Sequence, residues 1–164
     1  MENVLKHFID QYGVPWFFRG EKKVQRMTKE FLYDFISKHR LTVLATISEN
    51  NMPEAALVGF AITPDLEIIF DTVKTSRKYK NLLKNPAISF VVGWDGEQTV
   101  QYEGIARIPA DKQLENLLPY YFKVHPDGID RKENQKELVY FCVKPKWIRY
   151  ADFDTKKIEE IELH

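Results

Sequence analysis

The chain has 164 residues, of which 44% are hydrophobic and 29% are charged, so the composition indicates one folded domain and excludes long disorder. Its 24 basic and 24 acidic side chains balance to a net charge of zero, which disfavours a dedicated binder of duplex DNA. No apolar run reaches the length of a membrane span, and the one cysteine, Cys142, excludes an intramolecular disulfide and a cysteine-based zinc site.

The N-terminal segment is predicted to be mainly helical. Apolar residues recur at helical spacing as far as Tyr12, and Gly13 and Pro15 then interrupt the pattern. A second helix is expected to begin after Thr28, a residue type that is favourable as an N-cap. We expect residues 1–164 to form a single domain, with segment 1–40 packed on the rest.

Short β-branched segments separated by tight turns dominate the remainder of the chain. Their sequential order favours a mostly antiparallel barrel with peripheral helices over a doubly wound parallel sheet. Residues 125–136 are polar and contain Pro126 and Gly128, which predicts a mobile loop, and Pro145 is expected to end a strand. The predicted strands are 41–47, 55–62, 66–70, 87–94, 100–108 and 138–143, the extended segments are 147–153 and 157–163, and the helices are 75–84 and 111–122.

One candidate site lies where the strand ending at Phe70 gives way to a helix. Thr72 and Ser76 offer hydroxyl groups, and Arg77 and Lys78 fall in the first helical turn. Two cations oppose the helix dipole at that end, but a bound anion would offset them and would accept hydrogen bonds from the free N–H groups. The segment therefore predicts a phosphate site, and the alternative is an ordinary N-cap followed by a solvated basic face.

Three stretches together resemble the pyridoxamine 5′-phosphate oxidase-like, FMN-binding split-barrel family. The first is the strand–turn–strand unit of residues 41–46 and 53–58. The second runs from Ile69 through the Ser76-Arg77-Lys78 triplet to Asn85-Pro86 and Ser89, and the third is residues 103–106. The resemblance departs from the true oxidases at the C-terminal end, where Trp147-Ile148-Arg149 stands in place of their signature. It therefore indicates a small member of the family and implies no site for a substrate phosphate.

The resemblance implies a dimeric, antiparallel split β-barrel with FMN at the subunit interface. The strand of residues 55–58 would run along the isoalloxazine, Asp71 and Thr72 would line the ring or the ribityl chain, and a polar residue at Gln98 or Thr99 would reach the flavin from one subunit. Asp71 is equally well interpreted as a plain strand-end residue, and Trp147 as a core residue. The implied cofactor-binding residues are Ala55, Ala56, Leu57, Val58, Asp71, Thr72, Ser76, Arg77, Lys78, Thr99 and Trp147.

The leading functional hypothesis is an FMN-dependent oxidoreductase that acts on an unidentified small molecule. The alternatives are a non-catalytic flavin- or haem-binding module of the same fold, and a cofactor-free interaction domain. No two histidines have metal-ligand spacing, His125 is expected to be solvated rather than a proton donor, and Cys142 is expected to be a buried core thiol. The chain shows no secretory signal pattern, so a cytoplasmic location is expected.

Overall fold

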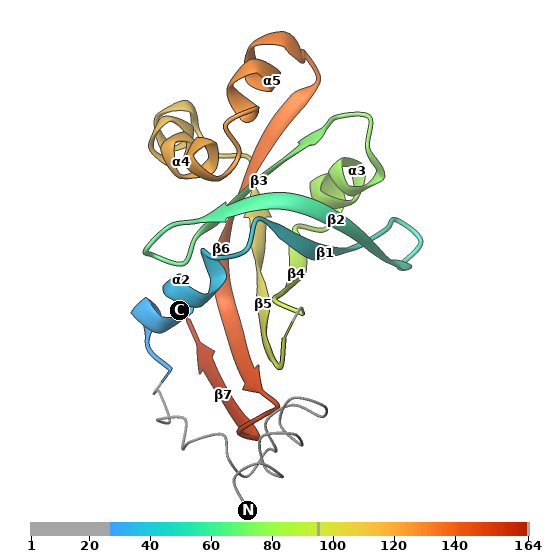
Figure 1. Cartoon of the computed structure of the whole chain (residues 1–164). Helices are drawn as coiled ribbons and strands as arrows, with labels where there is room; N and C mark the ends of the chain where they lie inside the picture. The colour runs from blue at the N-terminus through green and yellow to red at the C-terminus, as the bar shows by residue number, and fades with distance from the viewer. Residues whose placement is uncertain (1–26, 95, 164) are drawn as a thin grey trace, which may run out of the picture.

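Six antiparallel strands close a barrel in the computed structural model, which describes residues 27–94 and 96–163 (Figure 1). The strand order is β3-β2-β1-β4-β5-β6-β7, and pairing between β3 and β6 closes the ring, with β7 added outside it. This arrangement confirms the predicted split barrel. The strands are β1 (Leu41–Ile47), β2 (Pro53–Ile62), β3 (Ile68–Val73), β4 (Ala87–Val92), β5 (Gln98–Arg107), β6 (Leu138–Asp152) and β7 (Lys157–Glu162).

Helices α2 (Lys29–Ile36), α3 (Arg77–Lys84), α4 (Asp111–Val124) and α5 (Gly128–Asn134) surround the barrel. Helix α2 begins where the sequence predicts, because the Thr28 hydroxyl accepts a hydrogen bond from the Phe31 N–H at 3.1 Å. Its Phe31 and Phe35 rings meet Tyr150 at centroid distances of 4.9 and 5.7 Å, which anchors the helix on the barrel. The helix expected before Gly13 lies outside the described residues.

The barrel interior is filled mainly by aromatic and branched side chains from alternate strand positions. Phe60, Phe70, Phe90 and Tyr102 are completely buried. The Phe70 ring stacks on Phe141 at 5.6 Å and meets Phe90 edge-on at 5.9 Å. A smaller cluster lies outside the barrel, where α4 covers β2, β3 and β6 with Leu117, Leu118 and Tyr121.

The prediction that Pro145 ends a strand is wrong. Strand β6 continues through Pro145 to Asp152, because the register with β5 shifts at this point: Gly104 faces Pro145 and Glu103 faces Trp147, so Lys146 is an extra residue. A β-bulge of this kind accommodates a proline, which has no N–H to give to the ladder. The long β6 that results passes from the level of α5 to the opposite end of the barrel (Figure 1).

The prediction of a mobile loop over residues 125–136 is also wrong, because residues 128–134 form α5. This helix is polar on nearly all sides, so the hydrophobic periodicity that reveals most helices is missing. An ion pair between Arg131 of α5 and Asp71 of β3 ties it to the barrel. The Asp71 side chain is only 11% exposed, so its carboxylate is largely shielded from water.

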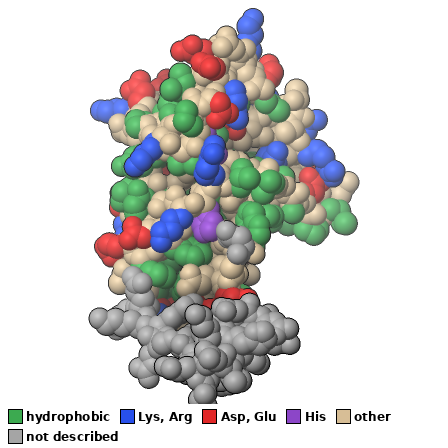
Figure 2. Space-filling model, in the orientation of Figure 1, with side chains coloured by type: hydrophobic (Ala, Val, Ile, Leu, Met, Phe, Trp, Pro, Cys, Tyr) green, Lys and Arg blue, Asp and Glu red, His purple; other side chains and the backbone are tan. Residues whose placement is uncertain are grey.

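No helix in the described part of the chain is long and apolar enough to cross a membrane. On the face shown in Figure 2, basic and acidic side chains are interspersed, and neither kind forms a broad continuous patch.

Candidate functional site

The main candidate site is a cavity of about 670 Å³ between β2 and the start of α3, called here the β2–α3 cavity. Its volume falls in the usual range for small-molecule and cofactor sites. Small residues form one wall, and two cations from the first turn of α3 form the other. The lining residues are Thr46, Met52, Pro53, Glu54, Ala55, Ala56, Arg77 and Lys78.

A carboxylate from the chain itself occupies the cationic side of this cavity. Glu54 forms an ion pair with Arg77 and accepts a hydrogen bond from the Asn81 Nδ2 at 2.9 Å. The same amide nitrogen lies 3.0 Å from the hydroxyl oxygen of Thr46. The Glu54 side chain is 17% exposed and that of Arg77 is 82% exposed, so the acid is held while the base extends into solvent.

The hydroxyl groups predicted for phosphate binding take part in ending β3 and starting α3. The Ser76 hydroxyl accepts a hydrogen bond from the Tyr79 N–H at 3.2 Å and caps the helix. It also lies 2.9 Å from the hydroxyl of Thr72. Arg77 and Lys78 are the first two residues of α3, so their side chains start from the helical turn whose backbone N–H groups have no acceptor within the helix. Lys78 has no carboxylate partner among the described residues.

The structure brings Ala55, Ala56, Arg77 and Lys78 to one cavity, as the predicted cofactor site requires. Two further predicted residues follow on the same strand: Leu57 is 58% exposed, whereas Val58 points into the barrel core. Asp71 and Thr72 face opposite sides of β3, because side chains alternate along a strand. Asp71 pairs with Arg131 outside the barrel, so it contacts neither the cavity nor Arg77.

Two other predicted residues lie elsewhere in the same subunit. Thr99 is on β5, where its hydroxyl donates to the Val92 carbonyl at 3.3 Å. Trp147 is half-buried on β6 opposite Glu103 and Glu162. Strands β1 and β4 separate β2 from β5, so one subunit does not bring these residues to the β2–α3 cavity. The role that the resemblance implies for Thr99 and Trp147 therefore stays a prediction about a second subunit.

Sequence reasoning missed Glu54, Asn81 and Thr46 as members of this site. One available signal was the alternation along β2, which gives Glu54 the same side of the strand as the buried Val58 and Phe60. A charged residue at an inward position normally requires a partner. Asn81 is 7% exposed within an otherwise basic helix, and nothing in its local sequence indicates that it faces β1 and β2.

The chemistry of these residues fits FMN. The test is the Glu54 carboxylate, which stands in for a phosphate: it is an anion on which the Arg77 guanidinium and the Asn81 amide both converge. Phosphate oxygens accept the same kinds of hydrogen bond. The small side chains of Ala55 and Ala56 leave the β2 backbone accessible to a flat ring.

The expectation that His125 is solvated is wrong. The residue is 8% exposed, and its Nε2 lies 3.1 Å from the Phe60 carbonyl oxygen. The ring also packs on Gly59, where an added Cβ would lie 2.9 Å from His125 Cε1, and it lies 4.9 Å from the Tyr121 ring. Because Gly59 has no side chain, the end of α4 can approach the outer face of β2 closely.

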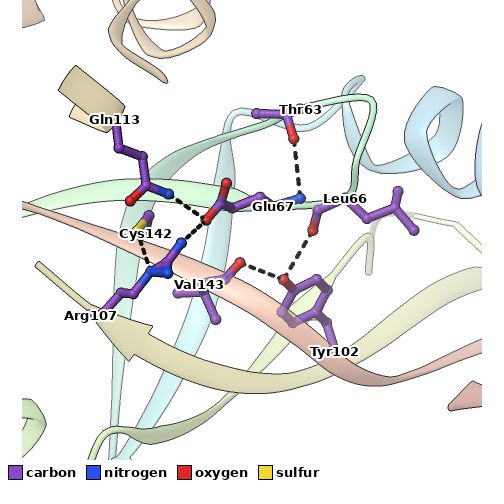
Figure 3. A network of polar contacts seen from close by, with 8 residues as sticks. All are labelled: Thr63, Leu66, Glu67, Tyr102, Arg107, Gln113, Cys142 and Val143. Atoms are coloured by element: carbon purple, nitrogen blue, oxygen red, sulfur yellow. Dashed lines mark hydrogen bonds and ion pairs between the residues drawn. The ribbon is translucent and has the colours of Figure 1, made fainter. Parts of the chain in front are cut away.

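A second polar cluster includes Cys142 of β6 and Arg107 of β5 and extends to the turn between β2 and β3 (Figure 3). The Arg107 Nε lies 3.3 Å from the Cys142 sulfur, and its guanidinium donates to Glu67 at 2.7 Å. The Tyr102 hydroxyl sits 3.0 Å from the Leu66 carbonyl and 2.9 Å from that of Val143, so it fastens the β2–β3 turn to β6. The cluster joins β5 and β6 to the turn between β2 and β3.

Cys142 is completely buried, as the sequence predicts, and burial raises the pKa of its thiol to about 11. The unfolded thiol ionises near 9.0, so between pH 9 and 11 the unfolded chain binds fewer protons than the folded one. Stability is therefore expected to fall over this interval. Urea titrations at several pH values check this, with Cys142→Ala as the comparison. If the parent and the variant lose stability with the same pH slope, the thiol is not responsible.

Comparison with known proteins identifies the fold and the family. Heme binding protein from Mycobacterium smegmatis superposes with a TM-score of 0.70 at 14% identity, over 85% of this chain and 60% of that one. General Stress Protein 26 from Bacillus anthracis gives 0.63 at 24% identity, over 82% and 98%. A putative pyridoxamine 5′-phosphate oxidase from Listeria innocua gives 0.60 at 18%, over 74% and 96%.

At these sequence identities the solved structures show a shared fold alone. This chain spans less than two thirds of the length of the heme binding protein from Mycobacterium smegmatis. The sequence matches none of the curated proteins with which it was compared. The model of the family described as pyridoxamine 5′-phosphate oxidase matches residues 28–152, which includes the whole barrel. The chain therefore belongs to the pyridoxamine 5′-phosphate oxidase family.

Proposed function

We propose that this protein binds FMN in the β2–α3 cavity and is a flavin-dependent oxidoreductase that acts on a small molecule. The observation that carries the proposal is the convergence of Ala55 and Ala56 with Arg77 and Lys78 around one cavity of about 670 Å³. Bound FMN would supply electron and hydride transfer, and the chain would supply the site and its electrostatics. The ring would lie against the β2 backbone, and the phosphate against the start of α3.

A dimer is part of this proposal. Leu57 is 58% exposed on the outer face of β2, beside Val43 of β1, which in turn faces Val91 of β4. This apolar face continues directly from the cavity wall formed by Ala55. A second copy related by a two-fold axis would cover it, and that is the commonest closed arrangement of identical subunits. The partner would then supply the Thr99 or Trp147 contacts.

We place the protein in the cytoplasm, where a free thiol such as Cys142 stays reduced.

The second candidate is a module that binds a flavin or haem without turnover. The names of two structural relatives support it: the heme binding protein from Mycobacterium smegmatis and the heme storage protein HutZ from Vibrio cholerae. FMN is favoured over haem at the β2–α3 cavity. Met52 is of a type that can ligate haem iron, but none of the described lining residues is a histidine, the usual partner of a methionine ligand, or a cysteine or tyrosine.

The test is the visible absorption spectrum of the purified full chain after incubation with excess FMN and gel filtration. A retained flavin spectrum with about one FMN per chain is the expected result. A protein that retains no FMN contradicts the proposal, and a Soret band after incubation with haem favours the second candidate.

Turnover separates the two flavin hypotheses. The FMN-loaded protein is expected to oxidise reduced nicotinamide cofactor in the presence of a small electron acceptor. Stoichiometric flavin without any turnover would leave the non-catalytic module as the better description.

A further inference from the structure

We propose that Glu54 is an intramolecular competitor for the phosphate subsite: its carboxylate occupies the place of the ligand's anion, and the ligand must displace it. The inference rests on the proposed function in taking that anion to be the FMN phosphate. It goes further because it makes Glu54 the residue that determines how much affinity the FMN phosphate adds.

The first argument is the shared set of donors. Arg77 and Asn81 both bind the Glu54 carboxylate, and Asn81 is itself held by Thr46 and buried to 7% exposure. A buried amide fixed in this way is preorganised to donate to an anion. The structure satisfies it with the chain's own carboxylate, so an arriving phosphate finds the same donors already engaged.

The second argument is electrostatic. A phosphate bound between Arg77 and Lys78 would lie within ion-pair reach of Glu54, because Glu54 contacts Arg77 directly. Two like charges at such separations repel strongly when they are partly shielded from water, and Glu54 is only 17% exposed. The two anions therefore cannot share Arg77 without cost, and binding becomes an exchange of one for the other.

The third argument is that displacement is sterically possible. Glu54 is the second residue of β2, at the rim of the barrel, and it lines both the β2–α3 cavity and a smaller cavity of about 280 Å³ beside it. Arg77 and Asn81 line the smaller cavity as well, and Lys84 on its wall is already paired with Glu49. The Glu54 side chain therefore has open space beside it into which it can turn when a phosphate engages Arg77.

The experiment compares FMN with riboflavin, which has the same ring but no phosphate, in the parent chain and in Glu54→Gln. The glutamine keeps the size of the side chain and one of its two acceptor oxygens and replaces the other with an NH2 donor, so the fold is expected to survive. Dissociation constants come from quenching of flavin fluorescence. The control is Glu49→Gln, which removes an equal charge from the nearby Glu49–Lys84 ion pair without touching Arg77 or Asn81.

We expect Glu54→Gln to bind FMN about tenfold more tightly than the parent, with riboflavin affinity unchanged and Glu49→Gln like the parent. Equal FMN affinity in Glu54→Gln and the parent, or an equal gain in Glu49→Gln, overturns the inference.

A second measurement keeps the inference testable if no variant binds either flavin, an outcome that would refute the proposed function by itself. Inorganic phosphate is titrated against chloride at matched ionic strength, and the Tm is recorded. A ligand of the native state raises Tm by mass action. A phosphate-dependent rise in Glu54→Gln but not in the parent supports the competition, and no rise in either overturns it.

Discussion

The double variant Arg77→Ala/Lys78→Ala is expected to bind FMN roughly a hundredfold more weakly than the parent chain, because each lost charge-assisted contact to phosphate is worth about a factor of ten. Both side chains line the β2–α3 cavity. Riboflavin affinity should stay unchanged, since the lost partners address the phosphate and not the ring. Flavin fluorescence titrations of both ligands measure the effect.

The matched control is Lys80→Ala/Lys84→Ala, which removes two positive charges from the same helix without changing the β2–α3 cavity. This pair should alter FMN affinity by no more than a general charge effect, which added salt suppresses. If both double variants lose the same affinity, long-range attraction and not the proposed subsite binds the phosphate. Unchanged FMN affinity in Arg77→Ala/Lys78→Ala would show that these two residues do not form the phosphate site.

Gly104→Ala is expected to cost about 3 kcal/mol of unfolding free energy, the upper end of the range for overpacking a closed interior. A Cβ at this position would lie 2.4 Å from the Lys144 carbonyl oxygen and 2.7 Å from Val143 Cγ1. The first contact is with backbone that belongs to the β5–β6 ladder, so it cannot be relieved by rotating a side chain. The clash falls at the bulge that carries Pro145.

Thermal unfolding followed by circular dichroism measures this effect, and a loss of about 3 kcal/mol corresponds to a fall in Tm of roughly 6–12 °C for a chain of this size. The control is Gly96→Ala, because a Cβ at Gly96 meets nothing within 4 Å. That variant should unfold within a degree or two of the parent. Equal Tm values for Gly104→Ala and Gly96→Ala would mean that the bulge adapts freely.

The elements that the sequence predicts well are those whose signals are local. Alternation of apolar and polar residues over 100–108 identifies β5, and the capping preference of Thr28 marks the start of α2. The errors occur where a distant partner decides the structure. Pro145 continues a strand because Gly104 on another strand permits a bulge, and α5 is attached through Arg131 to a residue 60 positions earlier.

The residues of the candidate site fall into the same two groups, those with local sequence signals and those that depend on distant partners. Arg77 and Lys78 are apparent because they follow a strand directly and begin a helix, so short-range rules of helix ends apply to them. Glu54 and Asn81 are 27 positions apart, and only the closed barrel brings them together. In the proposed dimer, any contribution of Thr99 and Trp147 to the site would depend on contacts between subunits, which local sequence signals do not reveal.

The long strand β6 also determines when the chain can fold during its synthesis. It pairs with β3, β5 and β7, and it begins only at Leu138. Until the ribosome has released this segment, β3 and β5 have free edges, and the aromatic interior between them has no closing wall. Free edges of this kind invite pairing with other chains. The barrel is therefore completed only after β6 has been translated, and a nascent chain that stalls before β6 exposes these edges to other chains.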